Sequence, residues 1–178
     1  MFKLLLFIDC RSFTFSYKWY SKFKELGLNV KLLSFYQNKD IQNNDLYYIK
    51  SFMPNHRLKM IWSLKEVKKI VYEFKPDIIH AIQVTRQGFL ASLIDYHPYI
   101  VTAIGSDVFV EPKKSRIEKW IVQRCFKKAD LATSMAEHMT YYIKANFEID
   151  EKKLITFPWG GDTKIFNLEN RNIDENEP

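Results

Sequence analysis

Four times from residue 75 onward, a short apolar run is followed directly by glycine or polar residues. The apolar runs have the length of buried strands, and segments with helical spacing of apolar residues separate them. In an α/β protein, the residues that follow parallel strands gather at the carboxyl edge of the sheet. This alternation therefore predicts a mostly parallel sheet with a ligand site at that edge. The four phrases begin at Lys75, Thr102, Lys128 and Phe157.

The alternation of strands and helices favours a Rossmann-like three-layer α/β/α sandwich with about six or seven strands. We expect Ile8, Ile79, Val101 and Ile155 to lie in the sheet. The expected strands cover 4–8, 30–35, 46–49, 77–82, 99–104, 131–133 and 154–157. The expected helices cover 12–26, 58–74, 87–94, 115–128 and 135–145.

Two details of the helices can be predicted from side-chain spacing. In the helix over 58–74, the spacing of Ile61 and Leu64 places both on the inward face, with Lys59 outward. Before the helix over 135–145, Ser134 and Glu137 have the spacing of a capping box, in which each side chain bonds to a backbone amide of the first turn.

The length of 178 residues indicates one domain, and the composition excludes several classes of protein. The net charge is +6, but the basic residues are scattered and form no known nucleic-acid motif, so we expect no nucleic-acid partner. No apolar run approaches the roughly 20 residues that cross a membrane. Cys10 and Cys125 lie among apolar residues, which favours reduced core thiols in a cytoplasmic protein.

Polar residues after the first strand are the first candidates for a binding site. Arg11 and Ser12 follow this strand without any glycine, which excludes a dinucleotide fingerprint and a Walker loop. Ser12 at the start of a helix would leave free amides that face an anion, and Arg11 would add positive charge. Ordinary helix capping is an equal alternative.

The strand over 99–104 is followed by Ser106 and Asp107, which are candidates for holding sugar hydroxyls or, more simply, for making a turn. The last strand is followed by a tryptophan that offers a stacking face, two glycines and an aspartate. We expect Arg11, Ser106, Asp107, Trp159 and Asp162 to converge on one edge of the sheet. The full candidate set for an acceptor cleft is Arg11, Ser12, Ser106, Asp107, Trp159, Gly160, Gly161 and Asp162.

Residues for catalysis or metal binding do not stand out. No serine lies in a nucleophile elbow, and no two carboxylates have convincing spacing, so the catalytic residues stay unknown at this stage. His80 ends a strand without another histidine or acid at metal-ligand spacing. We therefore expect a core histidine, no metal and no cofactor.

The ordered set of phrases resembles the N-terminal domain of family 4 glycosyltransferases, which have the GT-B fold. The resemblance gives residues 1–166 as this domain and residues 167–178 as an acidic polar tail or a truncated interdomain linker. The matching residues are Pro76, Asp77 and His80 with Gly88, then Gly105, Ser106 and Asp107, then Ala129, Asp130 and Ser134, then Pro158, Gly160, Asp162 and Phe166.

This resemblance implies a retaining enzyme that uses a nucleotide sugar as co-substrate and needs no metal. In the family, the N-terminal domain mainly holds the acceptor, here a sugar or a lipid-linked sugar in surface polysaccharide or glycolipid synthesis. A C-terminal domain binds the donor through basic residues and a Glu-x7-Glu pair. The sequence ends before such a domain, so we expect no activity without a donor domain or a separate donor subunit.

Two departures from the family keep an alternative open. Ile104 and Ile82 stand where many family members have histidine, and isoleucine cannot form a hydrogen bond with a sugar. The alternative is a non-catalytic α/β binding or scaffold module, so whether the chain is an enzyme is undecided.

A basic helix adds an anionic membrane surface to the candidate partners, with a peripheral location at the inner face of the membrane. In the helix over 115–128, the apolar residues Ile117, Trp120, Ile121 and Phe126 are flanked by lysines and arginines. The simpler alternative, that the apolar residues pack on the sheet, is favoured two to one.

Overall fold

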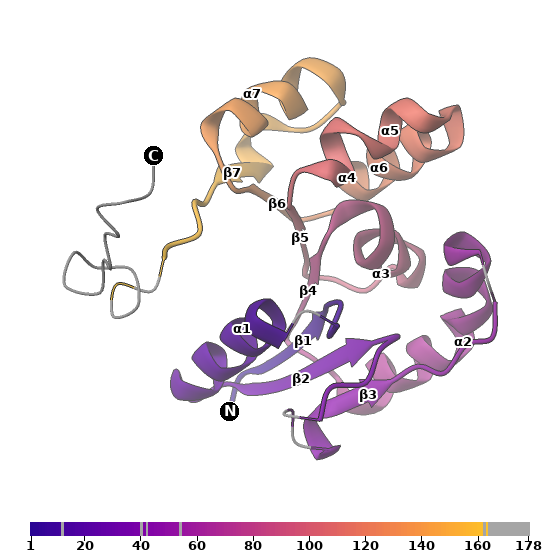
Figure 1. Cartoon of the computed structure of the whole chain (residues 1–178), viewed down its shortest axis with the longest axis vertical. Coiled ribbons are helices and arrows are strands. Elements are labelled where there is room, and N and C mark those ends of the chain that lie inside the picture. The colour runs from indigo at the N-terminus through magenta and orange to yellow at the C-terminus, as the bar shows by residue number, and fades with distance from the viewer. Residues whose placement is uncertain (12, 40, 42, 54, 162, 164–178) are drawn as a thin grey trace, which may run out of the picture.

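The computed structural model describes residues 1–163, except residues 12, 40, 42, 54 and 162 (Figure 1). Its seven strands form one sheet in the order β3-β2-β1-β4-β5-β6-β7, and every pair of neighbours is parallel. The predicted fold class is confirmed. The strands are β1 (Lys3–Phe7), β2 (Asn29–Ser34), β3 (Leu46–Tyr48), β4 (Ile78–Ile82), β5 (Tyr99–Ala103), β6 (Leu131–Ser134) and β7 (Leu154–Thr156).

The helices connect these strands. The α-helices are α1 (Phe13–Glu25), α2 (His56–Phe74), α3 (Phe89–Ile94), α4 (Ser106–Phe109), α5 (Glu111–Lys114), α6 (Arg116–Lys128) and α7 (Glu137–Asn146). Two 3-10 turns, η1 (Asn43–Asp45) and η3 (Glu151–Lys153), and one π-helical turn, η2 (Val84–Gly88), complete the described elements.

The core has two parts, one on each face of the sheet. Side chains alternate along a strand, so Leu5 and Phe7 of β1 join the larger core cluster and Leu4 and Leu6 join the smaller one. Helices α2, α3, α6 and α7 contribute to the larger cluster, and α1 contributes to the smaller one (Figure 1). Both faces of the sheet are therefore covered, as a parallel sheet requires.

The direction in which the chain moves through the sheet reverses between β1 and β4. From β1 the chain proceeds to β2 and β3 on one side, and from β4 it proceeds to β5, β6 and β7 on the other. In open parallel sheets, ligands bind in the crevice at the carboxyl ends of the strands that flank such a reversal. The fold thus marks the ends of β1 and β4 as the place for a site.

The four isoleucine and valine markers agree well with the predicted sheet. Ile79, Val101 and Ile155 lie in β4, β5 and β7. Ile8 directly follows β1, and its amide still donates a hydrogen bond to the carbonyl of Leu33 at 3.1 Å. Ile155 is half exposed, because β7 is the edge strand.

Two helix predictions were wrong in detail. In α2, Met60 and Val67 are buried on the inward face, whereas Ile61 is 56% exposed. Helix α7 begins at Glu137, and Ser134 lies within β6, where its hydroxyl contacts Thr140. The capping box therefore does not form. Both differences arise because the contact with the sheet, and not the local spacing, decides which residues face inward.

The apolar residues of α6 do not form one stripe. Ile121 and Phe126 are buried against the sheet, as the packing alternative expects, but Ile117 and Trp120 are 55% and 54% exposed. Cys10 and Cys125 are both buried, and neither forms a disulfide within the described residues, as expected for core thiols. No helix within the described residues is long and apolar enough to cross a membrane.

Candidate functional site

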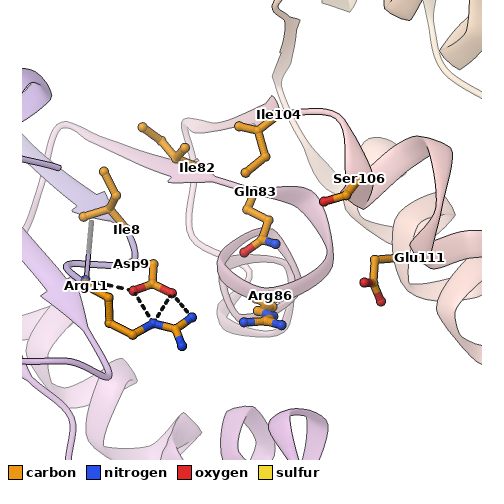
Figure 2. A pocket seen from close by; sticks show the side chains of 9 residues that line it. All are labelled: Ile8, Asp9, Arg11, Ile82, Gln83, Arg86, Ile104, Ser106 and Glu111. Carbon is orange, nitrogen blue, oxygen red and sulfur yellow. Dashed lines mark hydrogen bonds and ion pairs between the residues drawn. The ribbon is translucent and has the colours of Figure 1, made fainter. Parts of the chain in front are cut away.

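A pocket of about 330 Å³ lies at the carboxyl ends of β1, β4 and β5, beside the reversal of the strand order (Figure 2). We call it the edge pocket. Its residues come from the last position of β4, from the segments that follow the three strands and from α5. They are Ile8, Asp9, Arg11, Ile82, Gln83, Arg86, Ile104, Ser106 and Glu111.

One side of the edge pocket is apolar. Ile8, Ile82 and Ile104 each stand at the carboxyl end of one of the three neighbouring strands. In Figure 2 these three side chains lie along the strand ends, whereas Arg11, Arg86 and Glu111 lie on the opposite side of the pocket. The pocket thus joins an apolar wall to a charged rim, an arrangement that suits a ligand with one apolar and one polar face.

Arg11 is held by Asp9. The guanidinium donates from Nη2 to Oδ2 at 2.6 Å, and from Nε to both carboxylate oxygens at 3.1 Å. This hydrogen bond to Asp9 raises the pKa of Arg11. The guanidinium also lies 4.1 Å from the centre of the Tyr36 ring, with Lys59 5.1 Å from the same ring. Arg11 is therefore fixed in place at the pocket rim.

The arginine also affects the neighbouring Lys59. Burial lowers the pKa of the Lys59 ammonium, and the positive charge of Arg11 lowers it further. The two cations approach each other because Tyr36 offers a π-face to both. Their proximity gives this end of the pocket a positive field.

Asp107 lies beneath the edge pocket and not in it. Its side chain is fully buried, and its carboxylate accepts hydrogen bonds from the amides of Val84 at 2.7 Å, Ile104 at 3.0 Å and Gly105 at 2.8 Å. Burial raises the pKa of this carboxyl group, and the backbone hydrogen bonds partly offset the effect. The expected role of Asp107 as a ligand of sugar hydroxyls does not fit this geometry, because the backbone already occupies the carboxylate.

The turn after β4 has an unusual backbone. Gln83 has a positive φ of 86°, a value that residues with a side chain rarely adopt, and the π-helical turn η2 follows directly. Strained backbone and π-turns concentrate at functional sites. Here the turn places Gln83 and Arg86 among the residues that line the edge pocket.

Ser106 is exposed at the pocket rim, at the start of α4. It is brought there by Gly105, whose φ of 125° only glycine adopts readily. Arg11 and Ser106, which are 95 positions apart in the sequence, thus line one pocket. Of the eight candidate residues, these two meet in the edge pocket.

Trp159 and Gly160 line a different hollow, and residues of α1 form its other side. This hollow has a volume of about 380 Å³, and we call it the α1 hollow. The Trp159 ring lies 5.7 Å from the Trp19 ring, which lies 5.6 Å from His80. Gly161 is exposed and lines neither hollow, and Ser12 and Asp162 lie outside the described residues. The predicted meeting of Asp162 with the other candidates thus stays a prediction.

His80 is a core residue, as expected. It is 8% exposed, and its Nε2 forms a hydrogen bond of 2.7 Å with Thr102 Oγ1, which in turn is 2.7 Å from Thr133 Oγ1. Burial lowers the pKa of His80 to about 4. Within the part of the chain that the structure describes, no three His, Cys, Asp or Glu side chains come together as a set of metal ligands.

The comparison with known families is decisive for the identity of the domain. A model of the family described as glycosyl transferase 4-like matches residues 3–136. The chain belongs to this family. No curated protein matches the chain by sequence.

Solved structures of the same fold agree with this membership. Sucrose-phosphate synthase from Thermosynechococcus elongatus is similar with a TM-score of 0.70 and 9% identity, over 93% of this chain and 50% of that one. A glycosyltransferase from Rickettsia africae has a TM-score of 0.65 and 15% identity, over 98% and 47%. A UDP-N-acetylglucosamine 2-epimerase from Rickettsia bellii has a TM-score of 0.66 and 15% identity, over 88% and 44%.

These identities are low, so the solved structures show the fold alone. The glycosyl transferase 4-like chain has the Rossmann-like architecture of one half of a GT-B protein. It spans between 44% and 50% of the length of the three similar proteins.

Reasoning from the sequence missed Gln83, Arg86 and Glu111. Arg86 is a charged residue a few positions after an apolar strand, in the segment that joins the strand to the next helix, and this position could have indicated it. The helical spacing of apolar residues begins only at Gln87, so the sequence gives no register that would place Arg86. Asp9 was visible directly after the first strand, but its ion pair with Arg11 follows only from the coordinates.

Proposed function

We propose that this domain is the acceptor-binding half of a retaining glycosyltransferase that takes its sugar from a nucleotide sugar. The observation that carries the proposal is the edge pocket at the strand-order reversal, with an apolar wall of three isoleucines and a polar rim. Sugars have apolar C–H faces and polar hydroxyl edges, so such a pocket suits an acceptor sugar. Ser106 and Gln83 supply hydrogen-bonding groups at the rim.

The donor would come from a second domain or a separate subunit. Membership of the glycosyl transferase 4-like family and a length of half or less of the similar proteins both support this division. Catalysis then consists mainly of placing the acceptor hydroxyl beside the donor, where the departing phosphate helps to take its proton. Isolated, this chain would bind an acceptor and transfer nothing.

The biological setting proposed for this activity is surface polysaccharide or glycolipid synthesis in the cytoplasm. An acceptor linked to a lipid would bring the protein to the inner face of the membrane. The exposed Trp120 on the basic helix α6 is compatible with such a position. This part of the proposal rests on the resemblance to the family.

A non-catalytic binding module is the second candidate. Ile82 and Ile104 favour it, because both stand in the pocket wall where many family members have histidine. Neither side chain can form a hydrogen bond with a donor sugar. A module of this kind would bind a sugar in the edge pocket and would not release nucleotide with any donor domain.

Two measurements test the proposed function. Calorimetry of the isolated chain with a panel of nucleotide sugars should show no micromolar binding. Mixing the chain with a donor domain that carries the Glu-x7-Glu pair, encoded in a neighbouring reading frame, should release free nucleotide when an acceptor is present. Micromolar binding of nucleotide sugars to this chain alone would contradict the proposed division of labour.

A pocket variant makes the second measurement specific. Ser106→Trp should fill the mouth of the edge pocket and lower nucleotide release by at least about tenfold, since misplacement of an acceptor by 1 Å can cost about 100-fold. Lys65→Trp, on an exposed turn of α2, is the matched control and should leave nucleotide release unchanged. Unchanged release in Ser106→Trp would move the acceptor site elsewhere.

A further inference from the structure

The ionisable residues of the edge pocket are not equally paired. Asp9 pairs with Arg11 at 2.6 Å, and Glu111 pairs with Lys114 at 2.6 Å. Among the described residues, the structure has no ion pair or hydrogen bond for the guanidinium of Arg86. Both carboxylates of the pocket already have a cation, and the positive charge of Arg86 remains without an anion.

We infer that the acceptor held in the edge pocket carries an oxyanion, and that Arg86 binds it. The inference rests on the proposed function, because it names the chemical class of the acceptor. A guanidinium presents its N–H groups in a planar fork that matches a phosphate or a carboxylate with two parallel hydrogen bonds. Figure 2 shows Arg86 between Arg11 and Glu111, on the side of the pocket opposite the isoleucines.

The backbone holds Arg86 at this place. It lies in η2, one turn after the strained Gln83, and the carboxylate of Asp107 anchors the intervening amide of Val84. Gly88 ends the same turn, where its carbonyl accepts a hydrogen bond from the Tyr99 hydroxyl at 3.0 Å. Because the turn is fixed at both ends, its backbone loses little conformational freedom when the arginine binds an anion, and the cost is confined to the side chain.

Neighbouring cations strengthen the field at Arg86. Arg11 and Lys59 share the Tyr36 ring on one side. On another side lie Arg57 and His56. Burial lowers the pKa of His56 more than Glu118 raises it, so the imidazole is neutral near pH 7 and adds no positive charge. Glu118 lies 3.4 Å from Arg57 and 3.6 Å from His56, so its negative charge is paired with Arg57. An anion in the pocket would therefore meet a positive potential.

Three sugars that differ at one position test the inference. Glucose 6-phosphate, glucuronate and glucose share a ring and carry a phosphate, a carboxylate or no charge. The full chain, labelled with ¹⁵N, is titrated with each while the Nε–Hε signals of its arginines are observed. We expect a saturable shift of the Arg86 signal with at least one of the two anions, and binding about tenfold tighter than that of glucose.

Variants test whether Arg86 causes the preference for a charged sugar over glucose. Arg86→Gln should remove the roughly tenfold preference for the anion, and Arg86→Lys should keep part of it, because lysine retains the charge without the fork. Lys69→Gln removes the same charge from an exposed position late in α2 and should keep the full preference. Amide spectra of each variant report whether the fold is intact, and Arg86→Lys remains informative if Arg86→Gln unfolds.

The outcomes separate this inference from the proposed function. If glucose and both anions bind equally and shift the signals of pocket residues, the inference of an oxyanion would be overturned, whereas the proposal that the pocket binds an acceptor would stand. An equal loss of preference in Lys69→Gln and Arg86→Gln would also overturn it, since general charge would then explain the binding. If an anion binds at Arg86 but the mixing experiment releases no nucleotide, the oxyanion site would be supported and the proposed transferase function would be contradicted.

Discussion

The buried carboxylate of Asp107 accepts a hydrogen bond from the backbone amide of Val84 at 2.7 Å and so ties the turn after β5 to the turn after β4. The same carboxylate accepts hydrogen bonds from the amides of Ile104 and Gly105. These two turns supply Gln83, Arg86, Ile104 and Ser106 to the edge pocket. One side chain therefore holds together two turns that line the pocket, although it is not itself a lining residue.

Replacing Asp107 should cost stability and loosen the turn after β4. Asp107→Ala leaves one buried and two partly buried amides without this acceptor, and we expect the free energy of unfolding to fall by about 3 kcal/mol. Asp107→Asn keeps one acceptor oxygen and should lose less. Urea unfolding measures the loss, and hydrogen exchange of the Val84 amide should become faster in both variants. Protection of Val84 equal to that of the unchanged protein would show that the contact is not formed in solution.

Gly88 should be intolerant of a side chain. A Cβ atom there would lie 2.9 Å from Val101 Cγ2 and 3.2 Å from the Tyr99 hydroxyl oxygen. Overpacking of this kind costs about 1–3 kcal/mol, and the higher helix propensity of alanine returns about 1 kcal/mol. We thus expect Gly88→Ala to lower the free energy of unfolding by about 1 kcal/mol. Gly160→Ala is the control, because no atom lies within 4 Å of its added Cβ. A neutral Gly88→Ala would indicate that η2 can move.

The sheet could be predicted because each buried strand is a short apolar run between polar residues. The run before His80, for example, predicts a strand over 77–82, and β4 covers Ile78–Ile82. Helix faces were harder to predict where apolar residues are dense. At the start of α2, Leu58, Met60, Ile61 and Trp62 cover more than one face, and only the sheet decides that Met60 is buried and Ile61 is exposed.

The candidate site was only partly predictable. Arg11 and Ser106 could be found because each comes just after a strand, where parallel strands gather their side chains. Arg86 could not, since its place depends on the positive φ of Gln83 and on a π-helical turn. Asp107 looked like a ligand because the sequence does not show that an amide 23 positions earlier occupies its carboxylate.

His80 should make the protein less stable in mild acid. Its pKa is about 4 in the folded protein and near 6.5 when unfolded. Between these values only the unfolded state binds the proton, so the free energy of unfolding should fall as the pH drops from 6.5 to 4, by about 3 kcal/mol in total. His80→Gln, whose amide can still donate to Thr102, should lose that part of the pH dependence. Urea unfolding at pH 7, 5.5 and 4 measures it.

The control for His80 is His138→Gln, because His138 is exposed on α7. This variant should keep the steep fall of stability between pH 6.5 and 4. If His80→Gln showed the same pH dependence as the unchanged protein, the buried histidine would not be the cause, and other titrating groups would have to supply it.

Exposed residues on α6 should bring the protein to anionic membranes. Ile117 and Trp120 are each about half exposed, at 55% and 54%, beside the exposed Arg116 and Lys119. Tryptophan suits the membrane interface, and each basic side chain near an anionic surface contributes about 1 kcal/mol. We expect the chain to co-sediment with vesicles that contain phosphatidylserine, and binding should weaken as salt screens the charges.

Trp120→Ala should reduce this co-sedimentation, because it removes the apolar group that enters the interface while the basic residues remain. Tyr141→Ala is the matched control: Tyr141 is 69% exposed on α7, so the variant removes an exposed aromatic ring from another helix. Equal binding to neutral and anionic vesicles would argue against attraction by the basic residues. An equal loss in Trp120→Ala and Tyr141→Ala would argue against α6 as the contact.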